Sequence, residues 1–102
     1  MQMNNQSALD KYDFTRLENM WMPLILDIIV EMVESRKCCD CAECVLDLAA
    51  LGMNRLPPKY WVSGGYNAYT TPEMFFSNPE NRQIAQQAVN QALAIIQKNP
   101  HH

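Results

Sequence analysis

Internal histidine is missing from this sequence, and glycine is scarce. The chain of 102 residues has two histidines, both at its very end, and three glycines. The usual Ser-His-Asp and Cys-His nucleophilic sites need a histidine, and phosphate-binding loops need clustered glycines. The carboxylates are spread along the chain and suggest no acid–base pair. We therefore expect a protein that is not an enzyme.

Positive charge is also in short supply. Lysine and arginine number 8, against 11 aspartate and glutamate residues, which gives a formal net charge of -3 at pH 7. A protein that binds duplex DNA without strong sequence preference normally has a basic face and a high isoelectric point. We therefore expect no direct binding to duplex DNA, although a few local cations can still hold a small anion.

Long apolar runs are absent as well. The most apolar stretch, residues 20–33, contains Pro23, Asp27 and Glu31 and is too short to span a bilayer. The N-terminal residues lack the basic and then apolar order of a signal peptide. We expect a cytoplasmic protein without a membrane segment, in which thiols stay reduced and available to a metal.

The hydrophobic pattern predicts an all-α fold in a single small domain. We expect a flexible polar leader at residues 1–11 and one helical domain at residues 12–102. Apolar residues spaced by three and four predict three main helices. A short helical turn and one extended segment are expected between the second and the last of these helices. In chain order, the expected ranges are 14–33 and 41–53 for two helices, 59–62 for the extended segment, 72–76 for the short turn and 78–98 for the last helix.

Capping residues and prolines set the expected ends of these helices. Asp13 is a candidate N-cap for the first helix, and Pro23 should kink that helix or divide it. Ser77 and Glu80 have the spacing of a capping box at the start of the last helix, with a proline inside it. Pro57 and Pro58 should end the second helix.

Two helices carry unusually broad apolar surfaces. The first has an apolar stripe wide enough to face partners on two sides, and the second is apolar nearly all round, which predicts the most buried element. The extended segment at 59–62 cannot form a sheet alone, so we expect an irregular packing site or a partner chain. Residues 63–65, Ser-Gly-Gly, predict a turn.

All four cysteines fall between Cys38 and Cys44. This crowding is unlike a secreted disulfide framework, which connects distant segments. Cys41 and Cys44 have the spacing of a zinc knuckle, and Cys39 is near enough to bind the same ion. A tetrahedral site needs a fourth ligand, which can be Cys38, Asp40, a histidine from elsewhere or a residue of a second chain.

Two other interpretations of the cysteines remain open. Beside Arg36 and Lys37 and near a helix N-terminus, the thiols can have lowered pKa values and act in redox chemistry. They can also be ordinary buried core residues without any function. An iron–sulfur cluster is disfavoured, because its cysteine motifs are longer and more widely spaced.

Half of the cations lie around the cysteine-containing helix, namely Arg36, Lys37, Arg55 and Lys59. If the chain folds back on itself, they can surround a phosphate-bearing ligand, with Tyr60 or Trp61 stacking on a base. The alternative is that they are solvated charges at helix ends that partly neutralise nearby carboxylates.

Residues 39–60 closely resemble the signature of the late competence development protein ComFB family, which runs roughly C-x-C-x-x-C-x-x-D-V-x-A-L-A-L-N-x-L-P-P-x-Y. This sequence has Leu48 where the family usually has valine, and Gly52 where it usually has alanine or leucine. The resemblance extends over about residues 13–100, and it makes His101 look native, although His101 and His102 can also begin a purification tag. The residues that fit the signature are Cys39, Cys41, Cys44, Asp47, Ala50, Leu51, Asn54, Leu56, Pro57, Pro58 and Tyr60.

The resemblance implies a small, mostly helical homodimer with a structural zinc and no known enzymatic activity. It implies that Cys39, Cys41 and Cys44 are metal ligands, with Cys38 as the candidate fourth. It further implies a link to competence or type IV pilus behaviour, and for some members a receptor for cyclic dinucleotides. Candidate ligand contacts carried over from the signature are Arg55, Pro57, Pro58, Lys59 and Tyr60.

Three functions therefore remain in competition. The first is a regulatory protein that binds zinc, senses c-di-GMP or c-di-AMP and signals to an unidentified protein partner. The second is an interaction module with structural zinc and no small ligand. The third is a thiol redox protein, which needs no metal.

Overall fold

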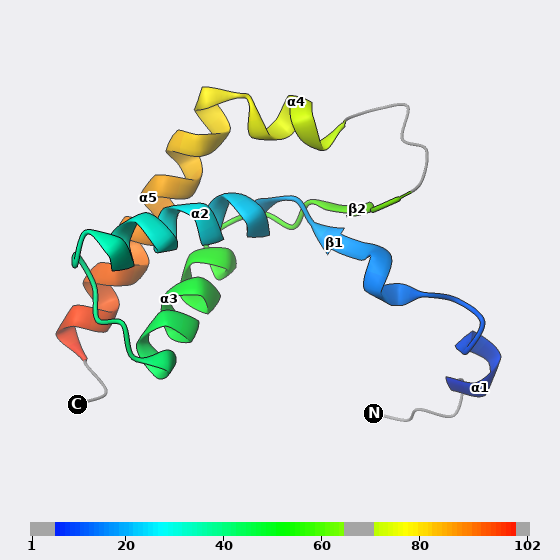
Figure 1. Cartoon of the computed structure of the whole chain (residues 1–102), viewed down its shortest axis with the longest axis horizontal. Helices are drawn as coiled ribbons and strands as arrows, with labels where there is room; N and C mark the ends of the chain where they lie inside the picture. Colours follow the sequence, from blue (N-terminus) through cyan, green and yellow to red (C-terminus); the bar gives the residue numbers. More distant parts are fainter. Residues whose placement is uncertain (1–5, 65–70, 100–102) are drawn as a thin grey trace.

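The computed structural model describes residues 6–64 and 71–99. It is mostly helical, as expected, with one small pair of strands (Figure 1). The N-terminal residues 1–5, Gly65 of the expected turn and the terminal histidines lie outside the described residues. The elements in chain order are α1 (Gln6–Leu9), a 3-10 turn (Phe14–Arg16), β1 (Leu17–Asn19), α2 (Trp21–Glu34), α3 (Ala42–Asn54), β2 (Tyr60–Val62), α4 (Pro72–Phe76) and α5 (Pro79–Lys98).

The first main helix begins later than the sequence predicted. Asp13 caps only the 3-10 turn, where its carboxylate accepts from the backbone N–H of Thr15. Helix α2 starts at Trp21, whose backbone N–H donates to the side chain of Asn19 at 2.9 Å. Pro23 therefore lies in the first turn, where its missing N–H would have had no partner in the helix. The expectation of a helix that begins at residue 14 and is kinked or divided at Pro23 is therefore wrong.

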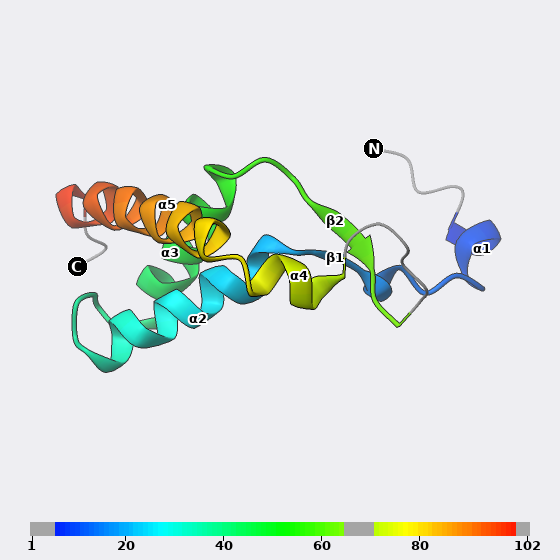
Figure 2. The same cartoon turned by 90° about the horizontal axis from the view of Figure 1, so that it is seen from above.

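The extended segment at 59–62 is confirmed, and its pairing partner is within the chain. Strand β2 runs antiparallel to β1, with Leu17 opposite Val62 and Asn19 opposite Tyr60. The expectation of an irregular packing site or a partner chain is wrong, because β1 of the same chain pairs with this segment. The partner strand was missed because the sequence pattern assigns the residues of β1 to a helix. Figures 1 and 2 show this two-stranded ribbon leading away from the helices.

The core lies between α2, α3 and α5, which pack against one another (Figure 2). Its largest fully buried side chains are Ile25 and Ile28 from α2, Leu48 from α3 and Val89 from α5. Alanines on α5 allow that helix to approach closely; Ala85 and Ala92 are both fully buried.

Helix α2, and not α3, is the most buried element. Six of its residues are buried, whereas α3 buries only Cys44, Leu48 and Gly52. Leu46 on α3 remains 64% exposed. The apolar pattern of α3 predicted too much burial, because one apolar side of the helix packs on the core and another faces outward. This outward side becomes part of the candidate site below.

The later helices follow their local sequence signals. Helix α4 begins at Pro72 after Thr71, whose hydroxyl accepts from the backbone N–H of Met74. Helix α5 ends at Lys98, as expected, but its N-cap is Asn78, whose side chain accepts from the backbone N–H of Glu80 at 2.9 Å. The expected capping box on Ser77 is wrong by one residue. Within the described ranges, no helix is both long and apolar enough to cross a bilayer.

Candidate functional site

Three cysteines meet where the loop after α2 enters α3. The Sγ atoms of Cys39, Cys41 and Cys44 all lie within 4.8 Å of one another. Cys41 is the N-cap of α3, and its sulfur accepts from the backbone N–H of Cys44 at 3.4 Å. The sulfur of Cys39 accepts from the backbone N–H of Cys41 at 3.5 Å. Cys44 is buried and Cys39 is exposed, so the cluster faces both the core and solvent.

This cluster fits a metal ion. Zinc–sulfur bonds of about 2.3 Å in a tetrahedron place neighbouring sulfur atoms about 3.8 Å apart. The three sulfurs therefore need to approach one another by at most about 1 Å to bind a single zinc ion. Backbone N–H donors and the positive end of α3 favour the thiolate form that a metal requires. The predicted three-thiolate core is thus brought together by the fold, and it could hold a metal ion.

The protonation of the three thiols is uneven. Hydrogen bonds from the backbone N–H and the thiol of Cys44 lower the pKa of Cys41. The same thiol–thiol hydrogen bond, followed by burial, raises the pKa of Cys44 to about 12. Cys44 therefore holds its proton more tightly than Cys41 does, and that proton favours the thiolate form of Cys41. A bound cation would take over that role.

Cys38 lies beside the cluster but outside the group of three. It is half-buried and packs against the core, and this burial raises the pKa of its thiol. Together with Cys39 and Cys44 it lines a cavity of about 90 Å³. The remaining walls of this cavity come from α3 and the last turns of α5, at Leu48, Leu93, Ile96 and Gln97.

The four cations do not form one cluster. Arg36 and Lys37 precede α3, whereas Arg55 and Lys59 follow it, so the two pairs lie at opposite ends of a helix about 20 Å long. Arg55 donates to the side chain of Gln91 at 3.0 Å, and the ammonium of Lys59 lies 5.9 Å from the ring centre of Phe75. The predicted arrangement of all four around one phosphate is therefore absent from the fold.

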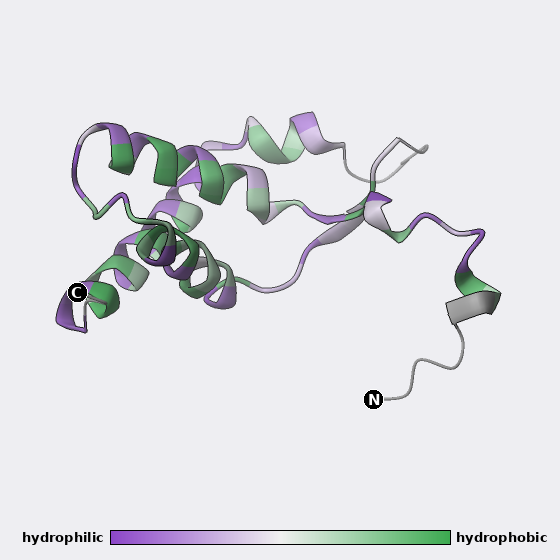
Figure 3. Cartoon of the chain, turned by 60° about the horizontal axis from the view of Figure 1, so that its bottom comes forward, coloured by the Kyte–Doolittle hydropathy of each residue, from purple (hydrophilic) through white to green (hydrophobic). Residues whose placement is uncertain are grey.

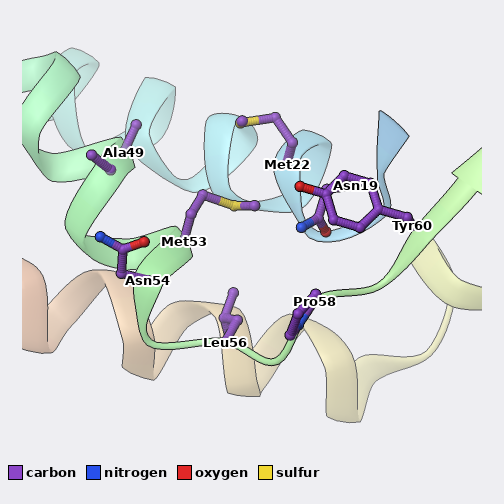
Figure 4. A pocket seen from close by; sticks show the side chains of 9 residues that line it. Asn19, Met22, Ala49, Met53, Asn54, Leu56, Pro58 and Tyr60 are labelled. Carbon is purple, nitrogen blue, oxygen red and sulfur yellow. The ribbon is translucent and has the colours of Figure 1, made fainter. Parts of the chain in front are cut away.

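A larger groove lies between α2, α3 and β2, with a volume of about 530 Å³ (Figure 4). Of the five predicted ligand contacts it includes Pro58 and Tyr60, whereas Arg55, Pro57 and Lys59 are not part of its lining. Sequence reasoning missed the rest of the groove, because its end is built by the pairing of Asn19 with Tyr60 across the two strands. The complete lining is Asn19, Met22, Ala49, Ala50, Met53, Asn54, Leu56, Pro58 and Tyr60.

The groove belongs to a wider apolar surface. On α2, exposed apolar side chains recur every four residues, which places them on one side of the helix. The first of them, Met22, shares the groove with Ala50 and Met53 of α3. Figure 3 shows the hydrophobic residues distributed along these helices. We call this surface the α2–α3 face, and it consists of Met22, Leu26, Val30, Leu46, Ala50 and Met53.

Comparison with known proteins adds one finding. The family model described as late competence development protein ComFB matches residues 18–100. This range includes the cysteine cluster and every residue that lines the groove. No curated protein and no solved structure matches the chain significantly.

Proposed function

The chain belongs to the late competence development protein ComFB family, and from this membership we propose that it is a non-enzymatic regulatory protein of the cytoplasm. We propose that it holds a structural zinc, forms a homodimer, binds a cyclic dinucleotide and passes that signal to a protein partner. Family membership indicates a regulatory role related to competence, and a link to type IV pilus behaviour is part of the proposal. The observation that carries the proposal is the close approach of three thiols at the start of α3.

Zinc is the metal that best suits this donor set. Cys39, Cys41 and Cys44 provide soft sulfur ligands, and Cys38 is the proposed fourth ligand because it lines the adjoining cavity with Cys39 and Cys44. Four thiolates would complete a closed structural site, which contributes binding free energy directly to folding. Elemental analysis should find one zinc per chain, and a metal-free folded protein would instead support the redox alternative.

The α2–α3 face supports a homodimer. Leu26 and Val30 on α2 and Leu46 on α3 are all more than 45% exposed. The two helices meet in the groove, where Met22 lies with Ala50 and Met53. Large contiguous apolar patches are uncommon on monomers and typical of interaction sites. A second copy can bury the same surface through a twofold axis, which pairs each residue of the face with its own equivalents or neighbours.

The dimer proposal has a direct test. Light scattering should give wild-type protein twice the 11.7 kDa chain mass. A charge in the face, Leu26→Asp or Val30→Asp, should halve that mass because an unpaired carboxylate is costly in an apolar interface. Met74→Asp is the control, since Met74 is 62% exposed on α4 and outside the face. A wild-type monomer would overturn the proposal, as would equal behaviour of all three variants.

The groove is the best candidate for a nucleotide. The side-chain amides of Asn19 and Asn54 can pair with the edge of a base, and the ring of Tyr60 can stack on one (Figure 4). Arg55 and Lys59 are the cations adjacent in the chain to groove-lining residues, and both are exposed. We propose that they leave Gln91 and Phe75 and neutralise the phosphates when the ligand binds.

Calorimetric titration of zinc-loaded protein with c-di-GMP and c-di-AMP tests the receptor proposal. Heat of binding is expected for at least one of them. The affinity should fall about 5- to 150-fold for Tyr60→Ala, because stacking contributes about 1–3 kcal/mol per base. Tyr12→Ala is the matched control, since Tyr12 is also more than half exposed but lies outside the groove. No heat with either nucleotide would overturn the receptor proposal and leave the interaction module without a small ligand.

A further inference from the structure

We propose that the last turn of α5 is part of the metal centre, with Gln97 as a positioning residue that donates its side-chain N–H to the zinc thiolates. This inference rests on the proposed zinc site, and it extends that site to an element 53 residues beyond its last cysteine. The metal would then connect the loop after α2, the start of α3 and the end of α5.

The small cavity beside the cysteines carries this inference. Its walls are three of the four cysteines, the apolar side chains Leu48, Leu93 and Ile96, and Gln97. Apart from the cysteines, Gln97 is the only residue in this lining with a polar side chain. An amide group carries two N–H donors, so it can supply hydrogen bonds in a wall that is otherwise apolar.

Thiolates on a metal need such donors. Zinc with three thiolates carries a formal charge of -1, and with four it carries -2, so N–H groups around the sulfurs stabilise the site. Backbone N–H groups already donate to Cys39 and Cys41. Cys44 lines the small cavity, and as a metal-bound thiolate its sulfur would be an acceptor with no proton of its own. The sulfur of Cys44 then requires a donor from another group, and Gln97 lines the same cavity.

The experiment compares four forms of the full-length protein by competition with a zinc chelator and by the spectrum of bound Co²⁺. Gln97→Glu is nearly isosteric but replaces the N–H donors with a negatively charged oxygen. Gln97→Arg restores N–H donors at the same position. Gln87→Glu introduces the same charge on an exposed position of α5, outside the cavity lining. Circular dichroism establishes that each form retains its helices.

The expected result is specific to the donor. Gln97→Glu should bind zinc about 10–100-fold more weakly, as is typical when an outer hydrogen-bond partner of a metal ligand is lost. Its sulfur-to-cobalt charge-transfer bands should also shift, because the electron density on the thiolates changes. Gln97→Arg and Gln87→Glu should stay within about threefold of wild type.

The outcomes separate this inference from the zinc site itself. If wild-type protein binds neither zinc nor Co²⁺, the zinc site fails and the role of Gln97 fails with it. If wild type binds both metals but Gln97→Glu matches Gln87→Glu, only the role of Gln97 is overturned. Equal weakening in Gln97→Arg and Gln97→Glu would also overturn it, because the donor would then make no difference.

Discussion

At the scale of single residues, Gly52 shows how closely α3 packs on its neighbours. A Cβ atom added there would lie 3.6 Å from both Ile25 Cδ1 and Val89 Cγ2, which is ordinary van der Waals contact. The helix therefore has room for one methyl group at this position but is bounded beyond it by buried side chains of α2 and α5. The family signature usually has alanine or leucine at this position. Because the space beside Gly52 is so small, glycine can replace them without opening a large void.

We predict opposite effects for two substitutions at this site. Gly52→Ala should raise the free energy of unfolding by about 0.5–1 kcal/mol, because glycine is unfavourable inside a helix and the methyl group fits. Gly52→Leu should lower it by about 1–3 kcal/mol through overpacking against Ile25 and Val89. Urea denaturation of the two variants measures both values. Destabilisation by alanine would contradict the 3.6 Å clearance around Gly52.

The cysteine thiols give a second prediction at this scale. In metal-free protein near neutral pH, Cys41 should alkylate faster than Cys44. The hydrogen bonds that Cys41 accepts lower its pKa, whereas the pKa of Cys44 is raised to about 12 and its side chain is buried. Mass spectrometry of peptides after brief iodoacetamide treatment resolves the two. Zinc should protect both, and faster labelling of Cys44 would contradict the hydrogen-bond direction.

At the scale of elements, local signals were sufficient for the later helices and misleading for the first. Helices α3, α4 and α5 follow from caps and prolines that lie next to their ends, so their ranges were predicted to within one residue. Strand β1 was missed because Leu17, Met20 and Trp21 continue a helical spacing, while its pairing partner is over 40 residues away. Pairing with a distant segment overrode local periodicity, as is common in short strands.

The start of α5 provides a test of the corrected cap. Asn78→Ala should lower the free energy of unfolding by about 1 kcal/mol, because the side chain of Asn78 accepts from the N–H of Glu80. Ser77→Ala should change it by less than about 0.5 kcal/mol, since its hydroxyl makes only a 3.4 Å contact to the carbonyl of Met74. Thermal unfolding of both variants compares them, and the reverse order would restore Ser77 as the cap.

At the scale of the whole molecule, the chain is more extended than its length suggests. Its radius of gyration is 16.3 Å, against about 13 Å for a compact domain of 100 residues. The helices α2, α3 and α5 pack at one end, while the ribbon and the segment before it project away (Figure 1). Sequence patterning predicted the helical class and the cysteine cluster, since both depend on nearby residues. It could not predict this shape or the groove, which depend on the pairing of β1 with β2.

Because the core of the described residues is built from only three main helices, a bound metal would be a major source of stability for the whole molecule. Zinc would fix the loop between α2 and α3. Among the elements that the structure describes, α3 and α5 form the most extensively packed pair. We predict that a zinc chelator lowers the melting temperature by at least about 10 °C, since 1 kcal/mol corresponds to about 4–8 °C in a domain of this size. Scanning calorimetry with and without chelator measures the shift. The same chelator should leave Cys44→Ser unchanged, because a variant that lacks a buried ligand has already lost the contribution of the metal. An unchanged melting temperature in zinc-loaded wild type would show that helix packing alone stabilises the fold, and that the three thiols meet without a structural role for the ion.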